Sequence, residues 1–165
     1  MSNKKKARPG GSINCKTFEL LNSKEKTINK FLTCNNDYCV YVLVCPCNQR
    51  YVGSTIFPVR KRILEHLRVI KNLDMSYPIA RHFNSQHERN PELLRFFAID
   101  RVEPSPRGGN RKRMLRQMEC KYILELDTKF PRGHNMDDVT LTYALEDFRR
   151  DIWRPVANSP RFPDQ

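Results

Sequence analysis

The sequence lacks any long apolar segment. No stretch approaches the roughly 20 consecutive apolar residues that a membrane-spanning helix needs, and the basic start MSNKKKARPGGS contains no apolar core of the kind that secretory signals carry. We therefore expect an intracellular protein with no membrane association, in a compartment where thiols stay reduced. Its six cysteines are then metal ligands, reactive groups or small core residues rather than a disulfide framework.

Acidic residues are scarce relative to basic ones. The 165-residue chain has 30 Lys and Arg against 18 Asp and Glu, which gives a net charge of +12. Such a chain is steered toward polyanions, and nucleic acid is the first candidate because phosphate contacts by Lys and Arg release counterions. A merely solubilising surface ranks lower because the charge is clustered. An anionic membrane ranks lower still because no long amphipathic basic helix is present.

The sequence contains no internal repeat, and its length allows one domain with tails rather than two cores. Residues 1–30 are predicted to form a basic, largely disordered tail. Its KKKAR run suits a nuclear address, a phosphate-seeking arm or an ordinary solvated tail, and we expect a nuclear protein. Residues 13–33 also contain two stretches, TFELLNS and TINKFLT, that have the composition of short strands.

The middle of the chain has the pattern of an α+β domain, with a small three-stranded antiparallel sheet flanked by helices. A β-branched apolar run, a turn and a second run predict a hairpin. An apolar stripe then predicts a helix that begins at Pro58. The expected elements are strands 39–45, 50–53 and 93–102, a helix from Pro58, a short helix from Pro78 that carries His82 and His87, and a long helix 110–126.

We expect residues 127–135 to form a loop after the long helix. Residues 138–165 are expected to form a C-terminal helix, from Thr140 to Trp153, followed by a tail.

Several residues near the hairpin have the chemistry of phosphodiester hydrolysis. Tyr41 and Tyr51 lie on the two paired strands, and Arg62 and His66 share one face of the following helix. Glu119 falls on the core-facing side of the long helix, where a carboxylate is costly unless it is paired or holds a metal. Arginine matches phosphate oxygens and a carboxylate anchors a divalent cation. Each residue alone has an ordinary structural explanation.

These residues also carry a resemblance. CVY, then YVG ten residues on, then KRILEH, resemble the motifs of the GIY-YIG nuclease family over roughly residues 31–137. The resemblance implies a GIY-YIG nuclease-like fold and an endodeoxyribonuclease. It also implies a set of functional positions, namely Tyr41, Tyr51, Arg62, His66, Glu119 and Asn135. In that family the glutamate holds the catalytic cation, so Glu119 implies Mg²⁺ or Mn²⁺.

Within the family the chain most resembles the endonuclease of Penelope-like retroelements. It shares a CPC triplet with them, together with PIARHFNSQH, RGGN and ECKYILELDTKFPRGHN at matching places. Cys39 replaces the glycine of the first motif, and Ser54 stands where a basic residue often follows the second. The upstream reverse transcriptase of such elements is absent, so a reverse transcriptase supplied elsewhere is a candidate partner.

The CPC triplet suggests a structural zinc site. His82 and His87 are separated by four residues, within the spacing of zinc-site histidines, and would complete a tetrahedral shell with Cys45 and Cys47. The related nucleases carry the same two-Cys, two-His set. Cys34 or Cys39 could instead replace a histidine, and packed thiols with surface histidines are the structural alternative. Cys15 and Cys120 are left as small buried or free thiols.

Three functions follow as hypotheses. The first is a metal-dependent endonuclease of retroelement origin that nicks one DNA strand, in which Arg62 neutralises charge and either tyrosine aligns the water. His66 would orient a tyrosine or shuttle a proton, and Asn135 would brace the phosphate or the Glu119 helix. The second is an inactive zinc-containing nucleic-acid-binding module, and the third is a structure-specific repair nuclease. A basic cluster would grip the DNA backbone: Arg107, Arg111, Lys112, Arg113 and Arg116.

Overall fold

The computed structural model describes residues 17–19, 25–27, 30–106 and 108–135. Along the chain the elements are β1 (Thr17–Glu19), β2 (Glu25–Thr27), β3 (Cys39–Val44), β4 (Arg50–Thr55), α1 (Val59–Lys71), α2 (Pro78–Gln86), the 3₁₀ turn η2 (Pro91–Leu93), β5 (Arg95–Arg101) and α3 (Arg111–Glu125). The predicted α+β order of strand, strand, helix, helix, strand, helix is confirmed. The first of the two strand-like stretches in residues 13–33 contains β1, which pairs antiparallel with β2; β2 lies before the second stretch and shares only Thr27 with it.

The main sheet has three antiparallel strands in the order β4-β3-β5. The central strand β3 is buried on both faces, which explains its uninterrupted apolar sequence CVYVLV. Its alternate side chains enter two separate cores, because successive residues of a strand point to opposite faces. The edge strand β4 leaves one row of backbone groups for other partners, and the Asn135 side chain bonds to Val52 there.

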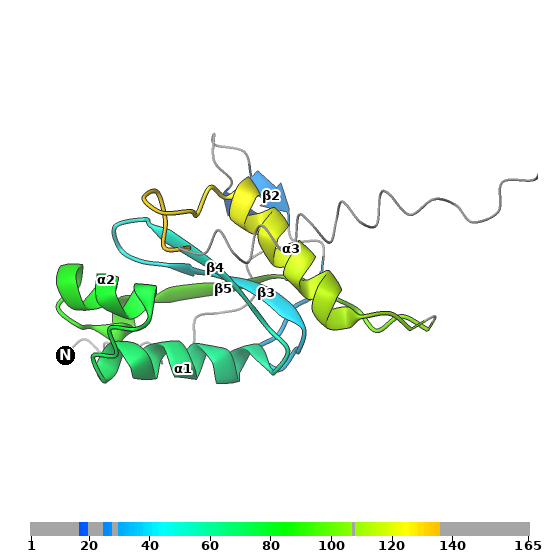
Figure 1. The fold of residues 1–165 in the computed structure, drawn as a ribbon, viewed down its shortest axis with the longest axis horizontal. Helices are drawn as coiled ribbons and strands as arrows, with labels where there is room; N and C mark the ends of the chain where they lie inside the picture. Colours follow the sequence, from blue (N-terminus) through cyan, green and yellow to red (C-terminus); the bar gives the residue numbers. More distant parts are fainter. Residues whose placement is uncertain (1–16, 20–24, 28–29, 107, 136–165) are drawn as a thin grey trace, which may run out of the picture.

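Helices cover both faces of this sheet (Figure 1). On one face, Tyr41 and Leu43 pack with residues of α1 and α2, including Ile63 and Phe83. On the other face, Val42 and Val52 pack with residues of α3. The predicted core stripes are confirmed: Val59, Ile63 and Ile70 of α1 are buried and Leu67 is partly buried, and Leu115, Tyr122 and Leu126 of the third helical segment are buried with Met118 packed against them.

Several boundaries differ from the sequence-based expectation. Strand β4 continues two residues beyond Gly53, and β5 begins two residues later than predicted because Pro91–Leu93 form a 3₁₀ turn. His87 is the C-cap of α2 rather than a residue inside the helix. The start of α3 was predicted correctly, since the Asn110 side chain accepts a hydrogen bond from the Arg113 N–H as an N-cap.

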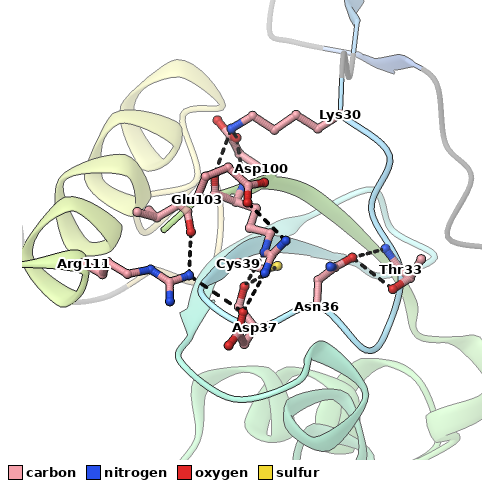
Figure 2. Close-up of polar contacts among 10 residues, drawn as sticks. Lys30, Thr33, Asn36, Asp37, Cys39, Asp100, Glu103 and Arg111 are labelled. Carbon is pink, nitrogen blue, oxygen red and sulfur yellow. Dashed lines mark hydrogen bonds and ion pairs between the residues drawn. The ribbon is translucent and has the colours of Figure 1, made fainter. Parts of the chain in front are cut away.

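A polar network joins the segment before β3 to β5 and α3 (Figure 2). Lys30 forms a 2.7 Å ion pair with Asp100, and Arg101 forms a 3.0 Å ion pair with Asp37. Arg111 donates a 2.7 Å hydrogen bond to the Val102 carbonyl. These contacts hold the first turn of α3 against the ends of β3 and β5, which fixes the position of the helix that carries Glu119.

Some predicted features fall outside the described residues. These are the N-terminal 16 residues with the KKKAR run and Cys15, the predicted helix Thr140–Trp153, and Arg107. The domain limits at residues 31 and 137 therefore stay predictions. Among the helices that the structure does describe, none has the length and apolar content to cross a membrane.

Candidate functional site

The hairpin places Tyr41 and Tyr51 on the same face of the sheet, as diagonal neighbours. Tyr41 pairs with Gly53 and Tyr51 pairs with Leu43. A Cβ atom at Gly53 would lie 2.5 Å from the Tyr41 hydroxyl oxygen and 2.9 Å from the Tyr51 ring. The Tyr41 ring therefore crosses over β4 because position 53 has no side chain.

Helix α1 supplies two partners for the Tyr41 hydroxyl. His66 Nε2 lies 2.8 Å from that oxygen, and Arg62 Nε donates a hydrogen bond to it at 3.2 Å. Arg62 also pairs with Glu65 at 2.9 Å, one turn further along the helix. The ring of Tyr51 contacts the other side of this group, with its centroid 5.8 Å from that of His66. The four residues that the sequence placed near the hairpin are thus gathered at one point.

The hydrogen-bond directions follow from the chemistry of the three groups. A guanidinium can only donate, so the Tyr41 oxygen accepts from Arg62 and its own proton points to His66 Nε2. Burial, followed by the positive charge of Arg62, lowers the pKa of His66 to about 3, so the imidazole is neutral and can accept that proton. Burial is also the main reason that the pKa of Tyr41 lies far above its ordinary value. At neutral pH Tyr41 is therefore a phenol, not a phenolate.

Glu119 approaches the same strand from α3. The Ser54 hydroxyl donates a 2.7 Å hydrogen bond to its carboxylate. Burial raises the pKa of Glu119, whereas the hydroxyl and backbone N–H of Ser54 and the charges of Arg62 and Arg116 lower it. Arg62 lines one pocket together with Ser54, so the α1 guanidinium lies near the carboxylate that Ser54 binds. The partly buried Glu119 carboxylate on the core-facing side of α3 is therefore hydrogen-bonded, which offsets the free-energy cost of removing a charge from water.

Asn135 lies against the outer edge of β4. Its side-chain oxygen accepts a 2.9 Å hydrogen bond from the Val52 N–H, and its side-chain nitrogen donates a 2.7 Å hydrogen bond to the Val52 carbonyl. Both functional atoms of the amide are thereby used. The His134 N–H also donates to the Arg50 carbonyl, so the loop after α3 is docked along the edge strand. Through these contacts Asn135 holds the loop after α3 against β4.

A pocket of about 370 Å³ lies between the end of β4, α1 and the first half of α3. We call it the edge pocket. Six of its lining residues carry the argument below: Ser54, Phe57, Arg62, Glu65, Lys112 and Arg116. Three of these side chains are cationic, and Ser54 is the residue that binds Glu119. The edge pocket is therefore a basic hollow beside the cluster of Tyr41, Arg62 and Glu119.

The predicted DNA-gripping cluster divides into different environments. Lys112 and Arg116 are exposed and line the edge pocket. Arg111 is engaged within the chain, since its guanidinium donates to the Val102 carbonyl and lies 3.7 Å above the Tyr38 ring. Arg113 is half-buried on the same helix turn. Only Lys112 and Arg116, among the described members of the cluster, are placed at the edge pocket.

The predicted zinc ligands come together at the other end of the sheet. The ligand atoms of Cys45, Cys47, His82 and His87 all lie within 4.8 Å of one another, so this group could hold a metal ion such as zinc. Cys47 Sγ is 3.1 Å from His82 Nε2, which is 3.0 Å from His87 Nε2. Cys34 and Cys39, the alternative ligands, are not in the group. Cys39 is buried at the opposite end of β3, and burial raises its pKa to about 12.

The structure joins Cys45 and Cys47 as a disulfide, with their Cα atoms 5.4 Å apart. This differs from the expectation that every cysteine is reduced. The CPC turn brings both sulfurs to one point, where they can either bond to each other or share a cation. Because zinc is bound by thiolates, a metal-bound form requires the reduced pair.

Sequence reasoning did not single out His134. It is buried, its Nε2 atom has no hydrogen-bond partner among the described residues, and its ring centroid lies 4.2 Å from that of His82. Burial is the main reason that its pKa falls to about 4. No spacing in the sequence links residue 134 to residue 82, so only the docking of the loop on β4 could reveal this contact. Phe57 was also missed, because an aromatic residue before a helix has no distinctive pattern.

Comparison of the chain with protein-family models, curated proteins and solved structures found no match in any of the three.

Proposed function

We propose that the chain is a metal-dependent DNA endonuclease of the GIY-YIG type that hydrolyses one phosphodiester bond and leaves a nick. One observation carries the proposal. Tyr41, Arg62 and His66 from the hairpin and α1, and Glu119 from α3, converge on strand β4 beside the basic edge pocket. A guanidinium, a carboxylate and a chain of hydrogen-bonded proton carriers are what phosphodiester hydrolysis requires.

The carboxylate of Glu119 fits a catalytic Mg²⁺ or Mn²⁺. Such ions are commonly held by one or two carboxylates together with water and the phosphates of the substrate. The Ser54 hydrogen bond leaves the carboxylate with further lone pairs for a cation. When bound there, the cation would act as a Lewis acid toward the scissile phosphate and the leaving oxygen.

The chain's own residues then divide the remaining tasks. Arg62 lines the edge pocket and would neutralise the phosphate charge that develops during hydrolysis. Tyr41 is fully buried, so its role is to hold Arg62 and His66 in register. Tyr51 is the more exposed tyrosine and is the better placed of the two to align the attacking water. His66, neutral and hydrogen-bonded through Nε2 to the Tyr41 hydroxyl, would orient that tyrosine.

The Cys/His group has a separate structural task in this proposal. A zinc ion there would clamp the turn between β3 and β4 to α2, because Cys45 and Cys47 come from the turn and His82 and His87 from the helix and its C-cap. Such a clamp suits a sheet of three short strands. The retroelement origin, the nuclear location and a reverse transcriptase partner remain parts of the proposal that follow from the sequence resemblance.

The test is nicking of supercoiled plasmid in Mg²⁺ or Mn²⁺. We expect Glu119→Gln and Arg62→Ala to lose at least about a hundredfold in nicking rate, as removal of transition-state stabilisers typically does, while binding to the same DNA is kept. Glu125→Gln is the matched control, since Glu125 is on the same helix and pairs with Lys121 at its far end. Equal nicking by wild type and Glu119→Gln would reject the proposal.

The nucleic-acid-binding module is the second candidate, and the full burial of Tyr41 favours it, because a phenol held away from solvent contributes structure without chemistry. In the same assay this candidate predicts binding to DNA with no nicking by wild type or variants. Cleavage confined to flaps or branched junctions would instead favour a repair nuclease.

A further inference from the structure

Phe57 is an exposed aromatic residue with a fixed backbone. It is 53% exposed and follows the end of β4 by two residues. The buried hydroxyl of Thr55 accepts a 3.1 Å hydrogen bond from the Phe57 N–H and donates one of 3.1 Å to the Phe57 carbonyl. Pro58 follows directly as the N-cap of α1. The ring is therefore presented to solvent from a rigid position, at low entropic cost for binding.

Several cationic side chains lie near this ring. Lys61 Nζ lies over it, 4.5 Å from the centroid. Phe57 also lines the edge pocket together with Arg62, Lys112 and Arg116. Aromatic rings set among cationic side chains are the usual surface for single-stranded nucleic acid, because bases stack on the ring while phosphates meet the charges.

The size of the pocket limits what can enter it. Small-ligand pockets begin at about 300 Å³, and the edge pocket, at about 370 Å³, has the size that holds one nucleotide. A base inside a duplex is stacked on both faces, so it must leave the stack before it can lie on Phe57. That release costs least where the base is already unpaired.

We propose that Phe57 is a stacking platform for one unpaired nucleobase, and that the preferred substrate is DNA with an unpaired base next to the phosphate at Arg62. The inference rests on the proposed function, because it names the substrate class of the same site. Lys112 and Arg116 would contact the flanking phosphates. Specificity would then come from DNA structure rather than from base sequence, because every base has a face that can stack.

The experiment measures binding apart from cutting. Two duplexes are compared in buffer without added Mg²⁺ or Mn²⁺, one fully paired and one with a single bulged 2-aminopurine. We expect the wild type to bind the bulged duplex about tenfold more tightly, as stacking of one base allows, and to quench the 2-aminopurine fluorescence. Phe57→Ala should lose both the preference and the quenching, and Phe57→Trp should keep both.

Phe31→Ala is the matched control, since Phe31 is 82% exposed and does not line the edge pocket. It should behave as wild type. A preference that persists in Phe57→Ala, or no preference in the wild type, would overturn the inference. Plasmid nicking is scored separately. Nicking without a Phe57-dependent preference rejects the inference alone, whereas the preference without nicking supports the platform and rejects the nuclease.

Discussion

The Ser54 hydroxyl donates a 2.7 Å hydrogen bond to the Glu119 carboxylate and so joins edge strand β4 to helix α3 across 65 residues of sequence. This contact turns the side of α3 that carries Glu119 toward the hydrogen-bonded pair of Tyr41 and Arg62. The Ser54 hydroxyl thereby fixes the direction of the Glu119 carboxylate.

Ser54→Ala is expected to lower the nicking rate about tenfold at limiting Mg²⁺, since a hydrogen bond to a charged group contributes about 1.5–3 kcal/mol. Ser54→Thr keeps the hydroxyl and should retain most of the rate. Plasmid nicking as a function of Mg²⁺ concentration measures the effect. Ser76→Ala, which removes an exposed hydroxyl bonded to Asp74, serves as the control. A nicking rate that is unchanged in Ser54→Ala would show that the Ser54–Glu119 hydrogen bond does not contribute to catalysis.

Gly53→Ala is expected to destabilise the fold by about 1–3 kcal/mol, the usual cost of overpacking a core. The added Cβ would lie 2.5 Å from the Tyr41 hydroxyl oxygen, in a position that the buried ring cannot leave easily. Urea denaturation gives the free energy of unfolding. Gly108→Ala is the matched control, because a Cβ added there meets no atom of the described non-neighbouring residues within 4 Å, and only the φ of +73° disfavours a side chain. A smaller loss at position 53 than at 108 would show that the Tyr41 ring moves freely.

The pKa of His66 makes stability depend on pH. In the folded chain burial lowers this pKa to about 3, whereas the unfolded value is near 6.5. Between these two pH values only the unfolded state carries the proton. The contribution of His66 to the free energy of unfolding is therefore complete above about pH 6.5, and it falls by about 1.4 kcal/mol for each pH unit below that value. Urea denaturation between pH 4.5 and 7.5 should show a steeper slope for wild type than for His66→Gln. Equal slopes for wild type and His66→Gln would mean that His66 has the same pKa in the folded and unfolded states.

The Cys/His group should bind one zinc ion per reduced chain. Zinc content after purification with a phosphine reductant is expected to fall in Cys47→Ser and in His87→Ala, and the melting temperature should fall with it because the metal binds the folded state. Oxidation of the Cys45–Cys47 pair removes both thiolates and should release the ion. Cys34→Ser is the control, because Cys34 is outside the group. Full zinc content in Cys47→Ser would exclude that sulfur as a ligand.

The elements and the core could be predicted because their periodicity is local. The continuous run from Cys39 marks a strand buried on both faces, and the stripe of Val59, Ile63 and Ile70 marks the inner side of α1. The errors lie at element ends, where capping decides the boundary. His87 is one such case, because its backbone conformation ends α2.

The candidate site was only partly accessible from sequence. Spacing brought Arg62 and His66 to one helix face, and strand pairing brought Tyr41 and Tyr51 to one sheet face. The roles of Arg111 and Asn135 were not accessible, because an arginine and an asparagine suit a phosphate as well as a backbone carbonyl. In the structure both side chains bind backbone carbonyls, those of Val102 and Val52 respectively.

By itself the sequence determined the order of strands and helices, the two-sided burial of β3 and the excess of positive charge, because these properties depend on neighbours along the chain. Only the tertiary structure decided that Glu119 meets Ser54, that the Tyr41 ring crosses Gly53, and that Phe57 stands beside a basic pocket. The first and the third of these contacts join elements far apart in sequence. Their geometry depends on how α1 and α3 pack around one edge strand, which no local pattern specifies.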